Sequence, residues 1–127
     1  MQEKHLFEYA VIRVVPRVER EEFLNVGVIL YCKQQKFLHL KFVVDARKLT
    51  AFCASCNVDE IEDNLQALNK ICNGEKNGGP IALLDAPSRF RWITAAKSTV
   101  VQASKVHPGL CIDANQTLDK LFAQLVL

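Results

Sequence analysis

The sequence predicts a single α+β domain, an antiparallel sheet of about four strands with helices packed on it. Two apolar runs, residues 6–15 and 25–32, are joined by a charged connector, residues 16–22. A third apolar run, residues 37–44, follows a polar turn at 33–35, so the second and third runs form a hairpin. The segments that follow space their apolar residues as amphipathic helices do. Strands first and helices after them are typical of the α+β class.

Each strand has its own signal. Residues 6–15 would place apolar side chains on both faces of a strand, which predicts an interior strand covered on both faces. Gly27, inside the run 25–32, predicts a bulge or a close approach of another backbone. Residues 98–103 are a fourth strand candidate. The sheet is therefore built largely from the first third of the chain.

Each helix has a start signal. Asp45 can cap a helix that runs to about residue 55, and Asp113 can cap a terminal helix. Asn57 is followed three residues later by Glu60, the spacing of a capping box. Pro87 occupies a first-turn position of a short helix. These signals predict helices on either side of a glycine-rich loop.

Length and composition narrow the class of protein. Residues 1–127 are one domain, with 50% hydrophobic and 24% charged residues. The formal net charge of +2 is too small to predict nucleic-acid binding by itself. The sequence contains no apolar stretch of the roughly twenty residues that a membrane span needs, and charges interrupt the amino-terminal segment. We therefore expect a cytoplasmic protein that does not enter the membrane, with its five cysteines reduced.

Cys53 and Cys56 have the spacing of a redox or metal motif, but we interpret them as core residues. They follow Leu49 and Phe52 at helical spacing, on one apolar stripe. A zinc site would need two further ligands at suitable spacing, and a redox pair would need an exposed helix amino terminus. No P-loop, GxSxG, HExxH or EF-hand pattern occurs in the sequence. We predict no metal and no cofactor.

The feature with the greatest functional content is Arg13, which lies inside an apolar strand. Burying a guanidinium costs several kcal/mol unless an anion meets it. The partner is Glu19 or Glu22 of the connector, or it is a ligand. Asn25 begins the second strand, so antiparallel pairing would bring it to the same end of the sheet as Arg13.

The leading hypothesis is a non-enzymatic binding module whose arginines take an anionic group: a phosphate, a nucleotide or another phosphorylated small molecule, or an acidic segment of a partner protein. Its predicted ligand-binding residues are Arg13, Arg17, Asn25, Arg89, Arg91 and Gln102. An alternative is a phosphoryl-transfer or phosphodiester-cleaving enzyme with arginines as charge stabilisers. Its catalytic candidates are His107, placed in a turn before Pro108, with Ser98, Glu19 and Glu22. A third reading is a buried salt-bridge network with a purely structural role.

Two long stretches resemble a bacterial family catalogued as domain of unknown function 3037. The first is Tyr9 to Leu30, and the second consists of Ser88 to Ala95 and Ser98 to Gln102, with Val106 to Leu110 following it. The family has no established activity. The resemblance implies a protein partner, a neighbouring kinase-like protein of a toxin family. Cys53 and Cys56 lie outside these stretches, in keeping with the core interpretation.

Overall fold

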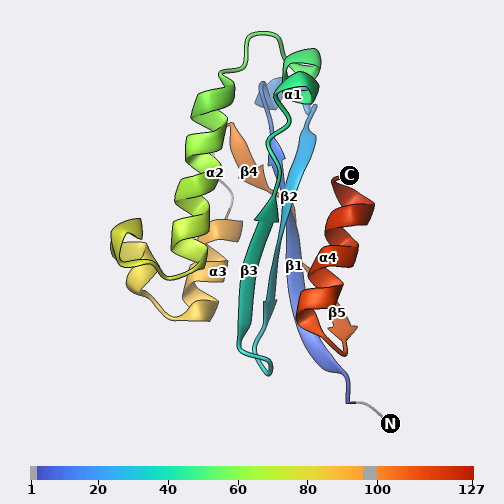
Figure 1. Ribbon diagram of the computed structural model, residues 1–127, viewed down its shortest axis with the longest axis vertical. Coiled ribbons are helices and arrows are strands. Elements are labelled where there is room, and N and C mark those ends of the chain that lie inside the picture. The colour runs from blue at the N-terminus through green and yellow to red at the C-terminus, as the bar shows by residue number, and fades with distance from the viewer. Residues whose placement is uncertain (1–2, 96–99) are drawn as a thin grey trace.

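The computed structural model describes residues 3–95 and 100–127, which form one antiparallel sheet with helices on both faces (Figure 1). The predicted α+β class is confirmed, with five strands where about four were expected. The strands are β1 (His5–Val14), β2 (Leu24–Cys32), β3 (Phe37–Phe42), β4 (Val101–Ala103) and β5 (His107–Cys111). Their order is β3-β2-β1, and both β4 and β5 pair with the remaining edge of β1. β1 is thus the central strand, as its apolar pattern predicts.

β1 and β2 pair in a register that contains one bulge. Ile12 lies opposite Gly27 and Arg13 opposite Asn25, so Val26 is the extra residue on β2. A Cβ atom on Gly27 would lie 2.8 Å from the carbonyl oxygen of Lys41 on β3. The sequence-based expectation of a bulge or a close approach at Gly27 is confirmed on both counts.

β4 and β5 are two segments of one edge strand, separated by an irregular stretch at Ser104. The Ser104 amide donates to the carbonyl of Val11, and the amide of Val11 donates to the Ser104 hydroxyl. The turn predicted at His107 is wrong, because His107 and Pro108 begin β5. A proline is tolerated in an edge strand, where its missing N–H can face away from the ladder.

The main core lies between one face of the sheet and three helices: α1 (Ala46–Phe52), α2 (Val58–Cys72) and α3 (Ala86–Thr94). The side chains of Asp45, Asn57 and Asp85 accept from backbone amides at the three helix starts. Even-numbered β1 residues, such as Ile12, face this core with Leu65 of α2. The predicted cap at Asn57 is confirmed.

The other face of the sheet is covered by α4 (Ala114–Leu125), which lies across β2 from α2 in Figure 1. Phe7 of β1 packs here with Leu118 and Phe122. Lys41 of β3 forms an ion pair of 2.8 Å with Asp119 of α4. The sheet therefore separates two apolar clusters. Odd-numbered residues of β1 face α4, and even-numbered residues face the opposite side of the sheet.

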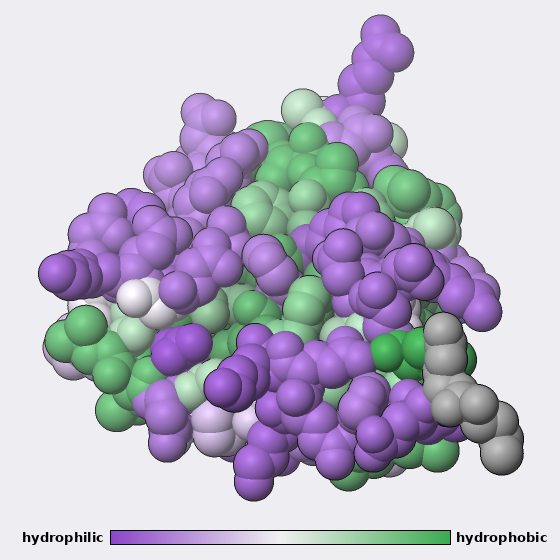
Figure 2. Space-filling view, turned by 60° about the horizontal axis from the view of Figure 1, so that its bottom comes forward, coloured by the Kyte–Doolittle hydropathy of each residue, from purple (hydrophilic) through white to green (hydrophobic). Residues whose placement is uncertain are grey.

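On the face shown in Figure 2, hydrophilic side chains predominate and apolar residues are exposed between them. Leu6 of β1 and Leu110 of β5 are cross-strand partners that are 61% and 64% exposed. Within the described part of the chain, none of the helices has the length and apolar character needed to cross a membrane.

Candidate functional site

Three of the predicted ligand-binding residues form a row across three neighbouring strands. Arg13 of β1 lies opposite Asn25 of β2 on one side and opposite Gln102 of β4 on the other. Directly paired residues point to the same face of an antiparallel sheet. Arg13 is an odd-numbered residue of β1, like Phe7, so the row lies on the face of the sheet that α4 covers. The sequence-based placement of Arg13 and Asn25 at one end of the sheet is confirmed.

The guanidinium of Arg13 is partly withdrawn from water, and an aromatic ring lies against it. Its Cζ atom lies 3.9 Å from the centroid of the Phe23 ring, a cation–π contact. Burial lowers the pKa of Arg13 from its usual value, although an arginine remains charged. Its Nε atom is buried and makes no hydrogen bond within residues 3–95 and 100–127. The positive charge is therefore partly desolvated.

The expected carboxylate partner of Arg13 is missing from the described residues. Glu22 forms its ion pair with Arg20, two residues away in the connector. Glu19 is exposed on a short 3₁₀ helix, Val18–Arg20. Arg13 belongs to none of the ion pairs that the described ranges contain. An internal salt-bridge network around Arg13 is thus not observed there.

Asn25 connects the row to the end of α4. Its Nδ2 atom donates a hydrogen bond of 3.1 Å to the carbonyl oxygen of Leu125. Its Oδ1 atom is buried and accepts no hydrogen bond from the part of the chain described. Lys48 of α1 also reaches this end, with Nζ 3.4 Å from the carbonyl oxygen of Val126. The last carbonyls of α4 are therefore met by side chains from β2 and α1.

Arg89 and Arg91, both on α3, lie apart from Arg13. Arg91 pairs with Glu8 of β1 at 2.7 Å. Glu8 is an even-numbered and Arg13 an odd-numbered residue of β1, so the Arg91–Glu8 ion pair and Arg13 lie on opposite faces of the sheet. Arg89 donates to the carbonyl oxygen of Leu84 and lies beside Cys72 at the carboxyl end of α2. A cation there complements the helix dipole, which gives Arg89 a structural role.

Arg17 lines a second feature, an open cleft of about 630 Å³ between the connector and the α1–α2 turn. Arg20 and Glu22 line it from the connector, while Cys53 and Cys56 line it from the turn. The core interpretation of the two cysteines is therefore wrong for Cys53 and only partly right for Cys56. The physical reason is that α1 ends at Phe52, before the predicted stripe is complete. Cys56 packs against the edge of the main core, and both thiols are partly exposed.

The catalytic candidates are not brought together by any described contact. His107 is exposed on β5, and its ring lies 5.3 Å from that of its cross-strand partner Tyr9. Tyr9 and Arg13 are four residues apart, or about 13 Å along β1. Ser98 lies outside the described residues, so a site shared by Ser98 and His107 stays a prediction.

Sequence reasoning missed Phe23 and the cleft. Phe23 is 46% exposed at the end of the connector, and only its contact with Arg13 distinguishes it from an ordinary apolar residue. The position of the cysteines in the cleft could have been predicted. Asn57, a helix cap, directly follows Cys56, which indicates that the two cysteines lie in a turn between helices. The part of the chain described contains no group of three or more His, Cys, Asp or Glu side chains arranged to hold a metal ion.

The comparisons with known proteins give one match. Neither the curated proteins nor the solved structures contain a match to this chain. A family model described as "Protein of unknown function (DUF3037)" matches residues 9–126, which include every strand and helix of the fold in whole or in part. The chain therefore belongs to the family of domain of unknown function 3037.

Proposed function

We propose that this domain is a non-enzymatic binding module in which Arg13 receives an anionic group from an acidic segment of a partner protein. The observation that carries the proposal is the half-buried guanidinium of Arg13, which has an aromatic ring against it and no carboxylate beside it among the described residues. A desolvated cation of this kind gains most from an anion supplied from outside.

The neighbours of Arg13 favour a protein partner over an enclosed small molecule. Phe23 exposes 46% of its surface next to the guanidinium, and the open cleft of about 630 Å³ is lined by Arg17 and not by Arg13. Arginine and aromatic side chains are the residues most often found to dominate protein interfaces. Asn25 and Gln102 are the cross-strand neighbours of Arg13, so polar side chains lie on either side of the arginine in its row.

The test follows the Nε–H resonance of Arg13 by NMR during titration with a glutamate-rich peptide, inorganic phosphate and a nucleotide. We expect the peptide to shift this resonance and to raise the melting temperature, with a stabilisation of about 2.7 kcal/mol at a hundred times the dissociation constant. Arg13→Ala should abolish the effect, and Phe23→Ala should weaken it.

Arg17→Ala is the matched control, because Arg17 is an exposed arginine of the neighbouring connector that lines the cleft instead. It should leave peptide binding unchanged. A shift with phosphate or nucleotide but not with peptide would replace the protein partner by a phosphorylated small molecule. No response of Arg13 to any of the three probes would contradict the proposal.

A further inference from the structure

The turn between α1 and α2 places two cysteines at the distance that a disulfide requires. Cys53 follows the last residue of α1, and Cys56 precedes Asn57, the cap of α2. The amide of Cys56 donates to the carbonyl oxygen of Cys53 at 3.2 Å, which closes a four-residue turn. The end residues of such a turn have Cα atoms less than about 7 Å apart, and disulfides join Cα atoms about 4.4–6.8 Å apart.

The two thiols already contact each other. The neighbours of the Cys53 sulfur in this turn are the thiol of Cys56 and the hydroxyl of Ser55, whose oxygen lies 3.5 Å from that sulfur. These contacts, Cys56 first, lower the pKa of Cys53. Burial, followed by the interaction with Cys53, raises the pKa of Cys56 from 9.0 to about 11. Cys53 is therefore the more readily ionised sulfur of the pair.

Both thiols open onto the cleft of about 630 Å³, which lies within the usual size range of small-molecule sites. Arg17, Arg20, Glu22 and Glu60 are the charged residues that line it. Because Arg20 pairs with Glu22, the side chain of Arg17 is the cation left to meet a carboxylate of an incoming molecule. A small molecule with carboxylates can therefore reach the Cys53 sulfur.

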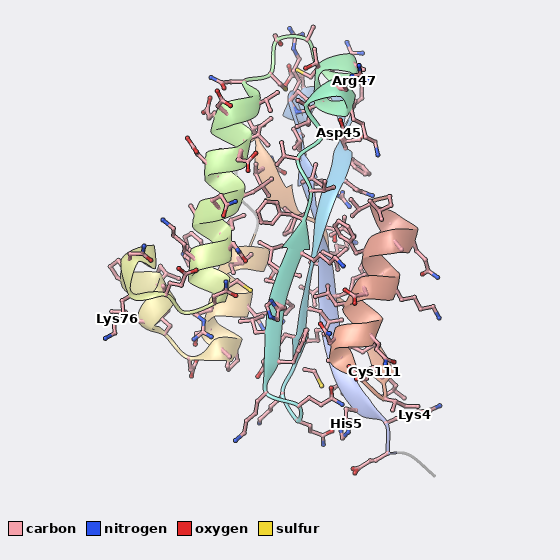
Figure 3. All side chains as sticks on the ribbon, in the orientation of Figure 1. Lys4, His5, Asp45, Arg47, Lys76 and Cys111 are labelled. Atoms are coloured by element: carbon pink, nitrogen blue, oxygen red, sulfur yellow. The ribbon has the colours of Figure 1, made fainter. Side chains whose placement is uncertain are left out.

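The other cysteines have different surroundings. Cys72 is buried, and burial raises its pKa to about 12. Cys32 and Cys111 are also buried, and burial raises the pKa of Cys111. Cys111 lies beside His5 at the end of the sheet away from α1, whose position Arg47 marks (Figure 3). These three thiols serve as internal controls for the pair in the cleft.

We propose that Cys53 and Cys56 are a redox-active dithiol, and that the cleft takes a low-molecular-weight disulfide with carboxylate groups, of the glutathione-disulfide class, as its oxidant. The Cys53 thiolate, its proton lost to solvent, attacks one sulfur of that disulfide. The S–S bond of the oxidant breaks, and its first half leaves as a thiolate that takes a proton from solvent. The Cys56 sulfur then loses its proton and attacks Cys53. The second half of the oxidant leaves as a thiol, so one disulfide is reduced as the Cys53–Cys56 disulfide forms.

The test exposes the full-length protein to glutathione disulfide, blocks the remaining thiols with N-ethylmaleimide, and maps the products by tryptic mass spectrometry. Residues 49–70 form one tryptic peptide that contains Cys53 and Cys56 and no other cysteine. We expect this peptide to lose two hydrogen atoms, and dithiothreitol to restore them. The peptides with Cys32, Cys72 and Cys111 should carry only N-ethylmaleimide.

Two variants separate the steps. Cys56→Ser should stop at a stable mixed disulfide between glutathione and Cys53. Cys53→Ser leaves only Cys56, whose burial still raises the pKa of its thiol, and it should react about tenfold more slowly near neutral pH, because each unit of pKa lowers the thiolate fraction about tenfold. Circular dichroism of both variants verifies that they are folded.

The proposal is overturned if residues 49–70 keep two free thiols, if glutathione remains attached to wild-type Cys53, or if Cys32 and Cys111 are oxidised instead. The assay contains no acidic peptide, and Arg13→Ala should oxidise at the wild-type rate. Failure of the anion site at Arg13 and failure of the dithiol are therefore distinguished.

Discussion

Replacing Arg13 by alanine tests whether the central strand needs this charge for folding. If Arg13 belonged to a buried internal ion pair, removing it would leave an uncompensated carboxylate and cost about 3–5 kcal/mol. The described residues place no carboxylate in an ion pair with it, and the guanidinium instead contacts the ring of Phe23 at 3.9 Å. We therefore expect Arg13→Ala to cost much less unfolding free energy than the loss of a buried ion pair would.

The magnitude follows from the contacts. A cation–π contact at a partly exposed site contributes about 0.5–1 kcal/mol. Removing the guanidinium also removes the desolvation cost that lowers the pKa of Arg13, which offsets part of this loss. We therefore expect Arg13→Ala to lower the free energy of unfolding by less than about 1 kcal/mol. Arg13→Met keeps an unbranched stem against Phe23, and we expect a smaller loss for it.

The assay is urea unfolding followed by circular dichroism, with the slope of the transition compared between variants. Arg91→Ala is the matched control, because Arg91 is an exposed arginine with a carboxylate partner, Glu8, and should cost about 0–1 kcal/mol. A loss of about 3 kcal/mol or more in both Arg13 variants would refute the reasoning, because it would require an internal anionic partner.

Three further predictions concern the scaffold. Gly27→Ala should destabilise the domain by about 1–3 kcal/mol, measured by urea unfolding, because the added Cβ would lie 2.8 Å from the carbonyl oxygen of Lys41; an unchanged midpoint would contradict the close strand packing. Asn57→Ala should cost about 1 kcal/mol in thermal unfolding, since the amide of Glu60 loses its cap, whereas Asn57→Asp should retain most of it. Burial raises the pKa of Cys72 from 9.0 to about 12, so the unfolded state ionises first and stability should fall by about 1.4 kcal/mol per pH unit across that interval. Urea unfolding at increasing alkaline pH measures the fall, and Cys72→Ala should flatten the slope; equal slopes in both proteins would exclude this cause.

Local signals in the sequence were sufficient for most of the fold. The apolar runs that became β1 and β2, the caps at Asp45, Asn57 and Asp113, and the tight position of Gly27 all act over a few residues. Such signals depend on backbone geometry and side-chain periodicity, which the sequence states directly. The placement of Arg13 and Asn25 at the same end of the sheet followed from antiparallel pairing alone.

The failures come from tertiary context. Pro108 and Gly109 are typical of a turn, but pairing with Glu8 and Phe7 draws them into an edge strand. The helical stripe that placed Cys53 in the core ends at Phe52, and helix ends are the least certain feature of a periodic pattern. The distribution of Arg13 and Arg91 over opposite faces depends on which helix covers which face, and local spacing carries no such information.

The strand pairing of β1 has a consequence for how the chain folds. β1 meets β2 soon after it is made, but its other edge pairs with β4 and β5, and His5 lies opposite Cys111. Asn25 likewise meets the carbonyl of Leu125, a hundred residues away. Contacts between such distant segments slow folding, because a long loop must close before they form. During synthesis on the ribosome, the second edge of the apolar strand β1 therefore stays unpaired until β4 and β5 have emerged, and it is open to aggregation over that interval.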